Sequence, residues 1–343
     1  MRSNRFIIAV LVCYFILNIL SLPEANALKK YKHTWKIGSV GPDGVGWAVF
    51  AKKELAPKIA EVTNGEVGFI WYWGCIMGDE EDYLAKMRIG QLQGQLGSVD
   101  SVIKGCPDMA VLNLPFLFND YGEVDYIRKH LRDRFDKGLM DNGYKMLIWF
   151  EQDFDVIFST KHEIRTPEDV KKSKFLIYGS EVEEATIKAL SGSPIHIPIP
   201  EVSSSIRAGV FDCAIGPNLW WLGAQLYTIT KSILVTPIRY SPGMIYITKR
   251  SWDKLSEKHK IAINKELPDL ERRFNIYIRD GNAKALKAMI NYGVKAVKLN
   301  EKELAVFKKR TRPVWDNLAG KAYPKKLLAE IIVLLKEYRN SKK

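Results

Sequence analysis

PIHIPIPEVSSSIRAGVFDCAIGPNLWW, residues 194–221, is the stretch from which we infer the fold class of this chain. Its alternating isoleucines predict a half-buried strand, and the prolines between them indicate that this strand soon ends. Val202 and Ile206 lie four residues apart on one face of a short helix, which Gly209 can close in a left-handed conformation. The apolar run 210–215 predicts a second strand. A short helix between two strands predicts a parallel crossover, and α/β sheets bind ligands at such strand ends.

An amide and two indole side chains follow the second of these strands. Asn218, Trp220 and Trp221 leave the strand at the end where a ligand would bind. Paired tryptophans suit a ligand cleft, although a packed surface loop would show the same pattern.

Length and composition indicate an exported globular protein. The 343 residues suffice for two cores of ordinary domain size, and 47% hydrophobic with 27% charged residues is typical of a folded chain. Residues 1–27 predict a secretory signal peptide, in which an apolar run, Phe6 to Leu22, precedes the cleavage pattern Ala25-Asn26-Ala27. An uncleaved membrane anchor is the alternative. No later stretch is long and apolar enough to span a bilayer, so we expect a soluble periplasmic protein after cleavage.

Charge and cysteine content narrow the possible partners. A net charge of +13 could indicate nucleic acid or an anionic membrane surface, but Lys and Arg are spread along the chain. Because export also separates the protein from nucleic acid, we expect no nucleic-acid partner. Export leaves Cys75, Cys106 and Cys213, of which Cys213 is predicted in a core strand. Cys75 and Cys106 could form a disulfide or remain free.

The remaining sequence alternates between strand and helix patterns. A glycine-rich loop at 41–46 follows the first predicted strand and either lines a cleft or forms an ordinary turn. Residues 145–158 read as a strand, and Thr166 predicts an N-cap whose capping box includes Asp169. Further expectations are strands at 233–238 and 244–248 joined by a loop, a helical region 252–288 broken at Pro268, and an amphipathic terminal helix at 325–338. The acidic run 79–82 suits the N-terminus of a helix better than a metal site.

Several motifs, in this order, resemble the solute-binding proteins of tripartite ATP-independent periplasmic (TRAP) transporters. The resemblance covers nearly the whole mature chain and implies an α/β, two-lobed periplasmic-binding-protein-like fold, with mixed sheets, flanking helices and a ligand cleft between the lobes. It implies one lobe from residues 28–152 with about 244–285, and a second from 153–243 with about 286–343. The motifs are TNG at 63–65, GCIMG at 74–78, LPFLF at 114–118, Trp149, TPED at 166–169, PEV at 200–202, AGVFD at 208–212, Asn218 and WDKL at 252–255.

The sequence departs from the family pattern at the position of the residue that usually binds the ligand. Most TRAP solute-binding proteins hold a carboxylate with an arginine, whose planar fork fits two oxygens. The resemblance places Leu176 at that position, and Asp153 and Asp155 near the place of a second common arginine. We therefore predict an apolar or amphipathic ligand, or one bound by other polar groups. Arg239 could instead bind a small organic acid, and an arginine poised in the cleft to grip an acid would contradict the prediction.

The candidate ligand contacts are mostly aromatic. Such rings would bury ligand surface at about 25 cal/mol per Å², while Asn218 and Gln152 would orient the ligand. Core packing is the alternative for each aromatic. The candidates are Trp71, Trp73, Phe116, Phe118, Gln152, Phe154, Tyr178, Asn218, Trp220, Trp221, Arg239 and Tyr240.

Other functional classes fit less well. The five histidines lack metal-ligand spacing, and neither a nucleophile elbow nor a P-loop is present, so we expect no enzyme, metal or cofactor. The resemblance implies TRAP membrane permease subunits as partners. Motifs at 152–155, 216–220 and 239–242 also resemble a subgroup whose transporters add a periplasmic tetratricopeptide-repeat protein. An extracytoplasmic ligand sensor with the same fold is the remaining alternative.

Overall fold

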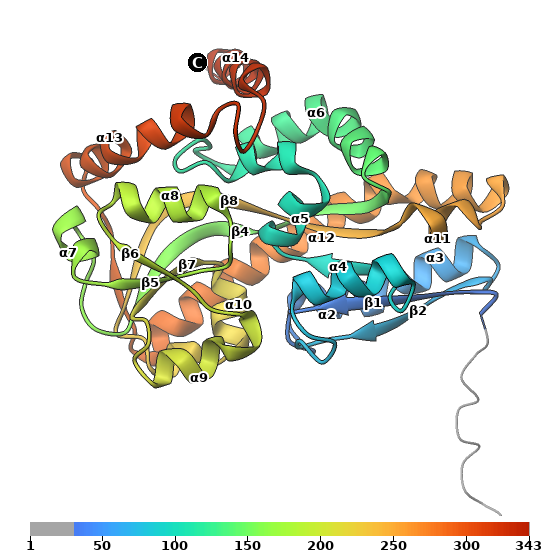
Figure 1. The fold of residues 1–343 in the computed structure, drawn as a ribbon, viewed down its shortest axis with the longest axis horizontal. Helices are drawn as coiled ribbons and strands as arrows, with labels where there is room; N and C mark the ends of the chain where they lie inside the picture. The colour runs from blue at the N-terminus through green and yellow to red at the C-terminus, as the bar shows by residue number, and fades with distance from the viewer. Residues whose placement is uncertain (1–30, 343) are drawn as a thin grey trace, which may run out of the picture.

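The computed structural model describes residues 31–342, so the predicted signal peptide lies outside the described residues. Within them the strands form one mixed sheet in the order β2-β1-β3-β8-β4-β7-β5-β6, with β9 paired to β8 (Figure 1). The strands are β1 (His33–Ser39), β2 (Val67–Tyr72), β3 (Gly94–Gly97), β4 (Tyr144–Ser159), β5 (Lys174–Ile177), β6 (Ser193–His196), β7 (Cys213–Gly216), β8 (Ser232–Thr248) and β9 (Lys295–Val297).

Two long antiparallel strands, β4 and β8, form the middle of the sheet. They pair from Tyr144 opposite Thr248 to Ser159 opposite Ser232, with three register shifts along the way. On one side β3 pairs with β8, and β1 lies parallel between β3 and β2. On the other side β7 pairs with β4, and β5 lies parallel between β7 and β6. The sheet therefore has two halves, β2-β1-β3 and β7-β5-β6, joined through β4 and β8.

Helices cover both faces of the sheet, and the long helix α12 packs on β4 and also contacts α2, α3 and α10 (Figure 1). Elements from both halves therefore meet along one helix. The α-helices are α2 (Gly46–Phe50), α3 (Ala56–Val62), α4 (Glu80–Ile89), α5 (Val99–Gly105), α6 (Tyr121–Asp141), α7 (Pro167–Lys171), α8 (Glu181–Ala189), α9 (Val202–Arg207), α10 (Asn218–Gly223), α11 (Lys249–Asp253), α12 (Glu257–Tyr292), α13 (Glu301–Leu318) and α14 (Lys325–Ser341). A π-helical turn, η1 (Ala51–Leu55), joins α2 to α3, and the 3₁₀ segments are η2 (Pro107–Asn113), η3 (Ile199–Glu201) and η4 (Leu226–Thr228).

Local signals in the sequence account for several of these elements. The crossover β6-α9-β7 forms as the sequence predicts, and Gly209 follows α9 with φ +73°. Thr166 caps α7, and its side chain and that of Asp169 satisfy each other's backbone N–H groups in a capping box. Because these signals need only neighbouring residues, they could be recognised without tertiary contacts.

Three local predictions were wrong. Residues 239–243 are not a loop but part of the continuous strand β8, because pairing with the bulged strand β4 accommodates Pro242 and Gly243. Pro268 does not break α12, whose buried face, including Leu270 and Phe274, packs in the core throughout. The expected loop after β7 is the helix α10.

The three cysteines of the described region are free. Cys106 and Cys213 are buried and Cys75 is half-buried. Of the two arrangements open from the sequence, the structure therefore shows free Cys75 and Cys106 rather than a disulfide.

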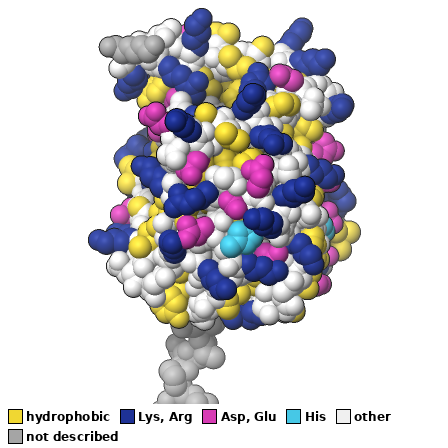
Figure 2. Space-filling view, turned by 90° about the vertical axis from the view of Figure 1, so that its left-hand side faces the viewer, with side chains coloured by type: hydrophobic (Ala, Val, Ile, Leu, Met, Phe, Trp, Pro, Cys, Tyr) yellow, Lys and Arg dark blue, Asp and Glu magenta, His cyan; other side chains and the backbone are white. Residues whose placement is uncertain are grey.

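The surface agrees with a dispersed basic charge. Figure 2 shows Lys and Arg spread over one face of the molecule, with Asp and Glu between them. Within the part of the chain that the structure describes, no helix is both long and apolar enough to cross a membrane.

Candidate functional site

A cavity lies where the carboxyl ends of four strands meet. Val40 follows β1, Ser98 follows β3, Tyr178 follows β5 and Pro217 follows β7. This is the place where open α/β sheets bind ligands, because the loops leaving the strands diverge there. The cavity encloses about 390 Å³ of space free of atoms, part of it open to solvent. Its lining residues are Val40, Ser98, Val99, Gln152, Asp155, Tyr178, Ile199, Ile215, Gly216, Pro217, Trp220 and Arg239.

Both halves of the sheet contribute to this cavity, and hydrogen bonds connect the elements around it. The backbone N–H of Ile199 donates to Asp79 Oδ2 at 3.0 Å, and that of Val99 donates to Gln152 Oε1 at 3.2 Å. Asp79 also caps α4, so one carboxylate serves a helix terminus and the opposite wall. A solute in this cavity would therefore lie between two connected walls.

Arg239 is held in the cavity wall by two acidic side chains. Its Nε donates to Asp155 Oδ2 at 3.0 Å and its Nη2 donates to Glu183 Oε1 at 2.8 Å. All three side chains are at most 2% exposed. Ser241 Oγ donates to Asp155 Oδ2, and the N–H of Tyr178 donates to Glu183 Oε2 at 2.7 Å. We call Arg239, Asp155 and Glu183 the buried triad.

Burial and mutual attraction shift the pKa of each group in the buried triad. Desolvation raises the pKa of Asp155 and of Glu183, although Arg239 opposes both shifts. Burial alone would lower the pKa of Arg239, but the two acids raise it above its ordinary value. Arg239 therefore stays charged, and most of its fork already binds protein carboxylates.

A second buried carboxylate organises the chain beside the cavity. Asp153 Oδ2 accepts from the backbone and side-chain amides of Asn218 at 3.1 and 2.7 Å, and Oδ1 accepts from Tyr121 Oη at 3.0 Å. Burial raises the pKa of Asp153 to about 7, against the effect of the Asn218 hydrogen bonds. Asn218 thus orients Asp153, and it does not line the cavity.

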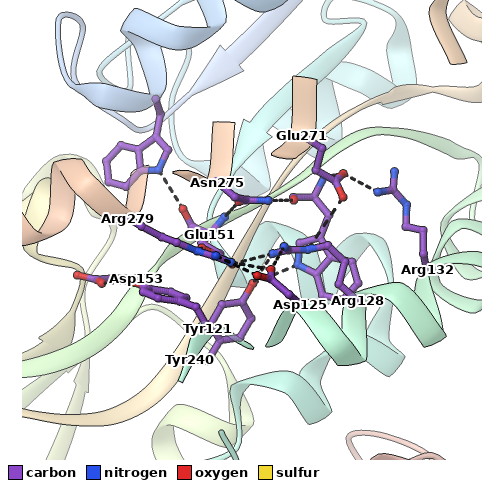
Figure 3. A network of polar contacts seen from close by, with 12 residues as sticks. Tyr121, Asp125, Arg128, Arg132, Glu151, Asp153, Tyr240, Glu271, Asn275 and Arg279 are labelled. Atoms are coloured by element: carbon purple, nitrogen blue, oxygen red, sulfur yellow. Dashed lines mark hydrogen bonds and ion pairs between the residues drawn. The ribbon is translucent and has the colours of Figure 1, made fainter. Parts of the chain in front are cut away.

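A charged network ties α6 and α12 to β4 next to this site (Figure 3). The side chain of Glu151 is fully buried and accepts from Arg128 at 2.9 Å and from two nitrogens of Arg279 at 2.6 Å each. Arg279 also lies over the ring of Tyr121, with its Cζ 4.4 Å from the ring centroid. Because Tyr121 donates to Asp153, the network extends from the helices to the strand that carries the cavity residues.

The structure brings together only some of the candidates from the sequence. Gln152, Tyr178, Trp220 and Arg239 line the cavity, and the rings of Tyr178 and Trp220 meet edge to face at 6.3 Å. The glycine-rich loop contributes no lining residue, although Val40 precedes it. Leu176 is fully buried in a core cluster and does not line the cavity.

The other aromatic candidates pack elsewhere. Trp71 and Trp73 stack on each other at 5.0 Å, and Trp221 stacks on Phe158 at 4.3 Å. Phe116 packs against a core cluster near Lys308. Phe118 and Phe154 each meet the ring of Tyr240, and all three belong to the core cluster that includes residues of α6. These aromatics lie outside the lining of the cavity.

Sequence reasoning missed the residues that act through distant partners. Asp79 was read only as a helix signal, and Glu183 was not singled out. Glu183 lies 56 residues from Arg239 in sequence, so no local pattern connects them. The one available signal was Asp155, an acidic residue within an apolar strand pattern.

Comparison with known proteins shows the family of this chain. Residues 38–321 match the family model described as bacterial extracellular solute-binding protein, family 7. The chain belongs to this family. It is 26% identical over 330 residues to the C4-dicarboxylate-binding periplasmic protein DctP of Rhodobacter capsulatus, covering 92% of this chain and 94% of that one. It is 25% identical over 270 residues to a solute-binding protein of Chromohalobacter salexigens, covering 78% and 79%.

Solved structures support the same fold. The sugar acid binding protein of Advenella mimigardefordensis, in complex with galactonate, superposes with a TM-score of 0.84 over 90% of this chain and 99% of that one, at 19% identity. The α/β solute-binding fold, with a mixed sheet and flanking helices, is thereby confirmed. Family 7 proteins are extracytoplasmic TRAP-type solute-binding proteins and not enzymes, as the sequence predicts.

Proposed function

We propose that this chain is the periplasmic receptor of a TRAP transporter, and that it binds an apolar or amphipathic solute without the usual arginine clamp. The cavity at the strand ends would hold the solute, and the TRAP membrane permease would receive it. The walls support this proposal, because Val40, Val99, Ile199, Ile215 and Trp220 present apolar surface to the cavity.

The state of Arg239 is the single observation that carries the proposal. Its Nε and Nη2 already bind Asp155 and Glu183, so the guanidinium cannot offer a free planar fork to a carboxylate ligand. An arginine thus lies in the cavity wall, but two protein carboxylates bind it and compensate its charge.

Native mass spectrometry after gentle purification tests the proposal. The wild-type protein should carry an apolar or amphipathic small molecule, and Trp220→Ala should lose it because the ring lines the cavity. Trp71→Ala is the matched control, since it removes an equally half-buried indole outside the cavity and should retain the molecule. A co-purified small dicarboxylate would count strongly against the proposal.

A small organic acid is the second candidate ligand. Arg239 Nη1 is buried and has no hydrogen-bond partner within residues 31–342, so its two N–H groups remain for an acceptor. The names of the relatives point the same way, since one binds C4-dicarboxylates and another was solved with galactonate. A carboxylate bound at Nη1 in the wild-type protein would favour this candidate.

The remaining features of the proposal concern organisation and partners. We infer cleavage of residues 1–27, one lobe from 28–152 with about 244–285, and a second from 153–243 with about 286–343. These bounds place the division of β4 beside Gln152, where the strand passes the cavity. The motifs at 152–155, 216–220 and 239–242 lead us to propose a periplasmic tetratricopeptide-repeat protein as an additional partner.

A further inference from the structure

With both acids ionised, the buried triad carries one negative charge in excess. Asp155 and Glu183 each contribute a carboxylate and Arg239 one guanidinium, and all three are almost completely buried. Few charged groups screen such an excess, because Asp155 and Arg239 are the only charged residues that line the described cavity. The charge of this part of the cavity is therefore opposite to that expected of a site for anions.

Two atoms of the triad remain without partners. Asp155 Oδ1, an acceptor, and Arg239 Nη1, a donor, are both buried and form no hydrogen bond to any described residue. Both residues line the cavity. Because unpaired buried polar atoms are costly, a solute that satisfies both would gain most in binding.

We propose that the solute presents an uncharged polar head, such as an amide or a hydroxyl group, to the buried triad, and not a carboxylate. This inference rests on the proposed receptor function and specifies the chemistry of its ligand. An amide carbonyl accepts from Arg239 Nη1, while an amide N–H or a hydroxyl donates to Asp155 Oδ1. The apolar body of the solute then lies against Trp220 and the aliphatic wall.

A carboxylate head cannot make the same pair of contacts. Both of its oxygens are acceptors, so one of them could use Arg239 Nη1 but neither could donate to Asp155 Oδ1. The ionised head would also add a negative charge to a triad that already has one in excess. Asp155 thus determines specificity, and Arg239 serves as one hydrogen-bond donor and not as a clamp.

Asp155→Asn tests this assignment with little change in shape. Its amide oxygen can replace Oδ2, which accepts from Arg239 and Ser241, and its NH₂ group can take the place of the unpaired Oδ1. The substitution removes the negative charge of Asp155 and turns its unpaired acceptor into a donor beside Arg239 Nη1. Glu183→Gln, the matched variant, also neutralises the triad but leaves Asp155 Oδ1 as an acceptor.

The probes are acetate, which carries a carboxylate head group, and acetamide, which carries an amide head group. Each has only a methyl group as its apolar part. Their dissociation constants are measured on solute-free protein by tryptophan fluorescence and by NMR of the Trp220 indole. Wild-type protein should prefer acetamide by about tenfold or more, Asp155→Asn should shift the selectivity ratio toward acetate by about tenfold, and Glu183→Gln should shift it less. The same series with succinamide and succinate extends the test to a longer body.

The outcomes separate this inference from the receptor function. Preference of the wild type for acetate, or an Asp155→Asn ratio that does not move toward acetate, would overturn the inference. Absence of measurable acetate binding to Asp155→Asn would count against it equally. Acetate binding that shifts the Trp220 signal would still support a receptor function for this cavity. A Trp220 signal that responds to no probe and to no retained solute would contradict both the receptor function and this inference. Should Asp155→Asn fail to fold, the shift in Glu183→Gln decides, and no shift there contradicts the inference.

Discussion

Glu151→Gln should be among the most destabilising conservative substitutions in this protein. The side chain of Glu151 is fully buried and accepts hydrogen bonds from Arg128 and twice from Arg279 (Figure 3). A hydrogen bond to a charged group contributes about 1.5–3 kcal/mol, and breaking a buried ion pair from one side costs about 3–5 kcal/mol. Gln cannot neutralise two guanidiniums and turns one acceptor into a donor, so we expect the free energy of unfolding to fall by about 3–5 kcal/mol.

Urea unfolding monitored by tryptophan fluorescence measures this loss as a lower midpoint at unchanged slope. Glu330→Gln is the control, because Glu330 forms an exposed pair with Arg134, with side chains 47% and 38% exposed. That pair should contribute less than about 1 kcal/mol. If Glu151→Gln unfolds within about 1 kcal/mol of the wild type, the network is not stabilising and this reasoning is refuted.

Three further predictions concern the cavity and its surroundings. Asp79→Ser keeps a helix N-cap but loses the hydrogen bond from the backbone N–H of Ile199, which joins two elements beside the cavity. Stopped-flow release of the solute should therefore accelerate about five- to tenfold, and an unchanged rate would show that this hydrogen bond does not help to retain the solute. Gly94→Ala should destabilise the fold by more than about 1–3 kcal/mol, because its Cβ would lie 2.3 Å from the backbone oxygen of Tyr246. Gly216→Ala is the control and should unfold like the wild type, because a Cβ at Gly216 meets nothing within 4 Å. Equal unfolding midpoints for the two variants would show that the contact at Gly94 is unimportant. Burial raises the pKa of Asp153 to about 7, above its value near 3.8 in the unfolded chain. The stabilising effect of protonated Asp153 is therefore complete below about pH 4 and is lost as pH rises through 7, by about 1.4 kcal/mol per pH unit. Asp153→Asn should lack this pH dependence, and parallel curves of unfolding free energy against pH for the variant and the wild type would contradict the prediction.

Local sequence patterns predicted the elements that depend on neighbouring residues. The capping box at Thr166, the end of α9 at Gly209 and the long strand β4 all follow from adjacent positions. The predictions failed where tertiary packing opposes a local signal. Pro268 and Pro242 are normally breaking residues, yet core packing and pairing with β4 keep α12 and β8 continuous.

The site was harder to predict than the fold. Trp71 and Trp220 carry the same indole side chain, but one packs against a core cluster and the other lines the cavity. Helices cover both faces of the sheet. The face on which an aromatic ring lies therefore does not show whether the ring contacts a solute or packs in the core. The buried triad joins β4, α8 and β8, and only the folded chain shows that Glu183 compensates Arg239.

A crystal structure of the protein with the solute that it retains on purification tests the central claim most directly. We predict density in the cavity at the strand ends, with an uncharged head between Asp155 Oδ1 and Arg239 Nη1 and an apolar body against Trp220. The account would be contradicted by a carboxylate bound to the Arg239 guanidinium after its release from Asp155 and Glu183, or by a solute bound outside this cavity.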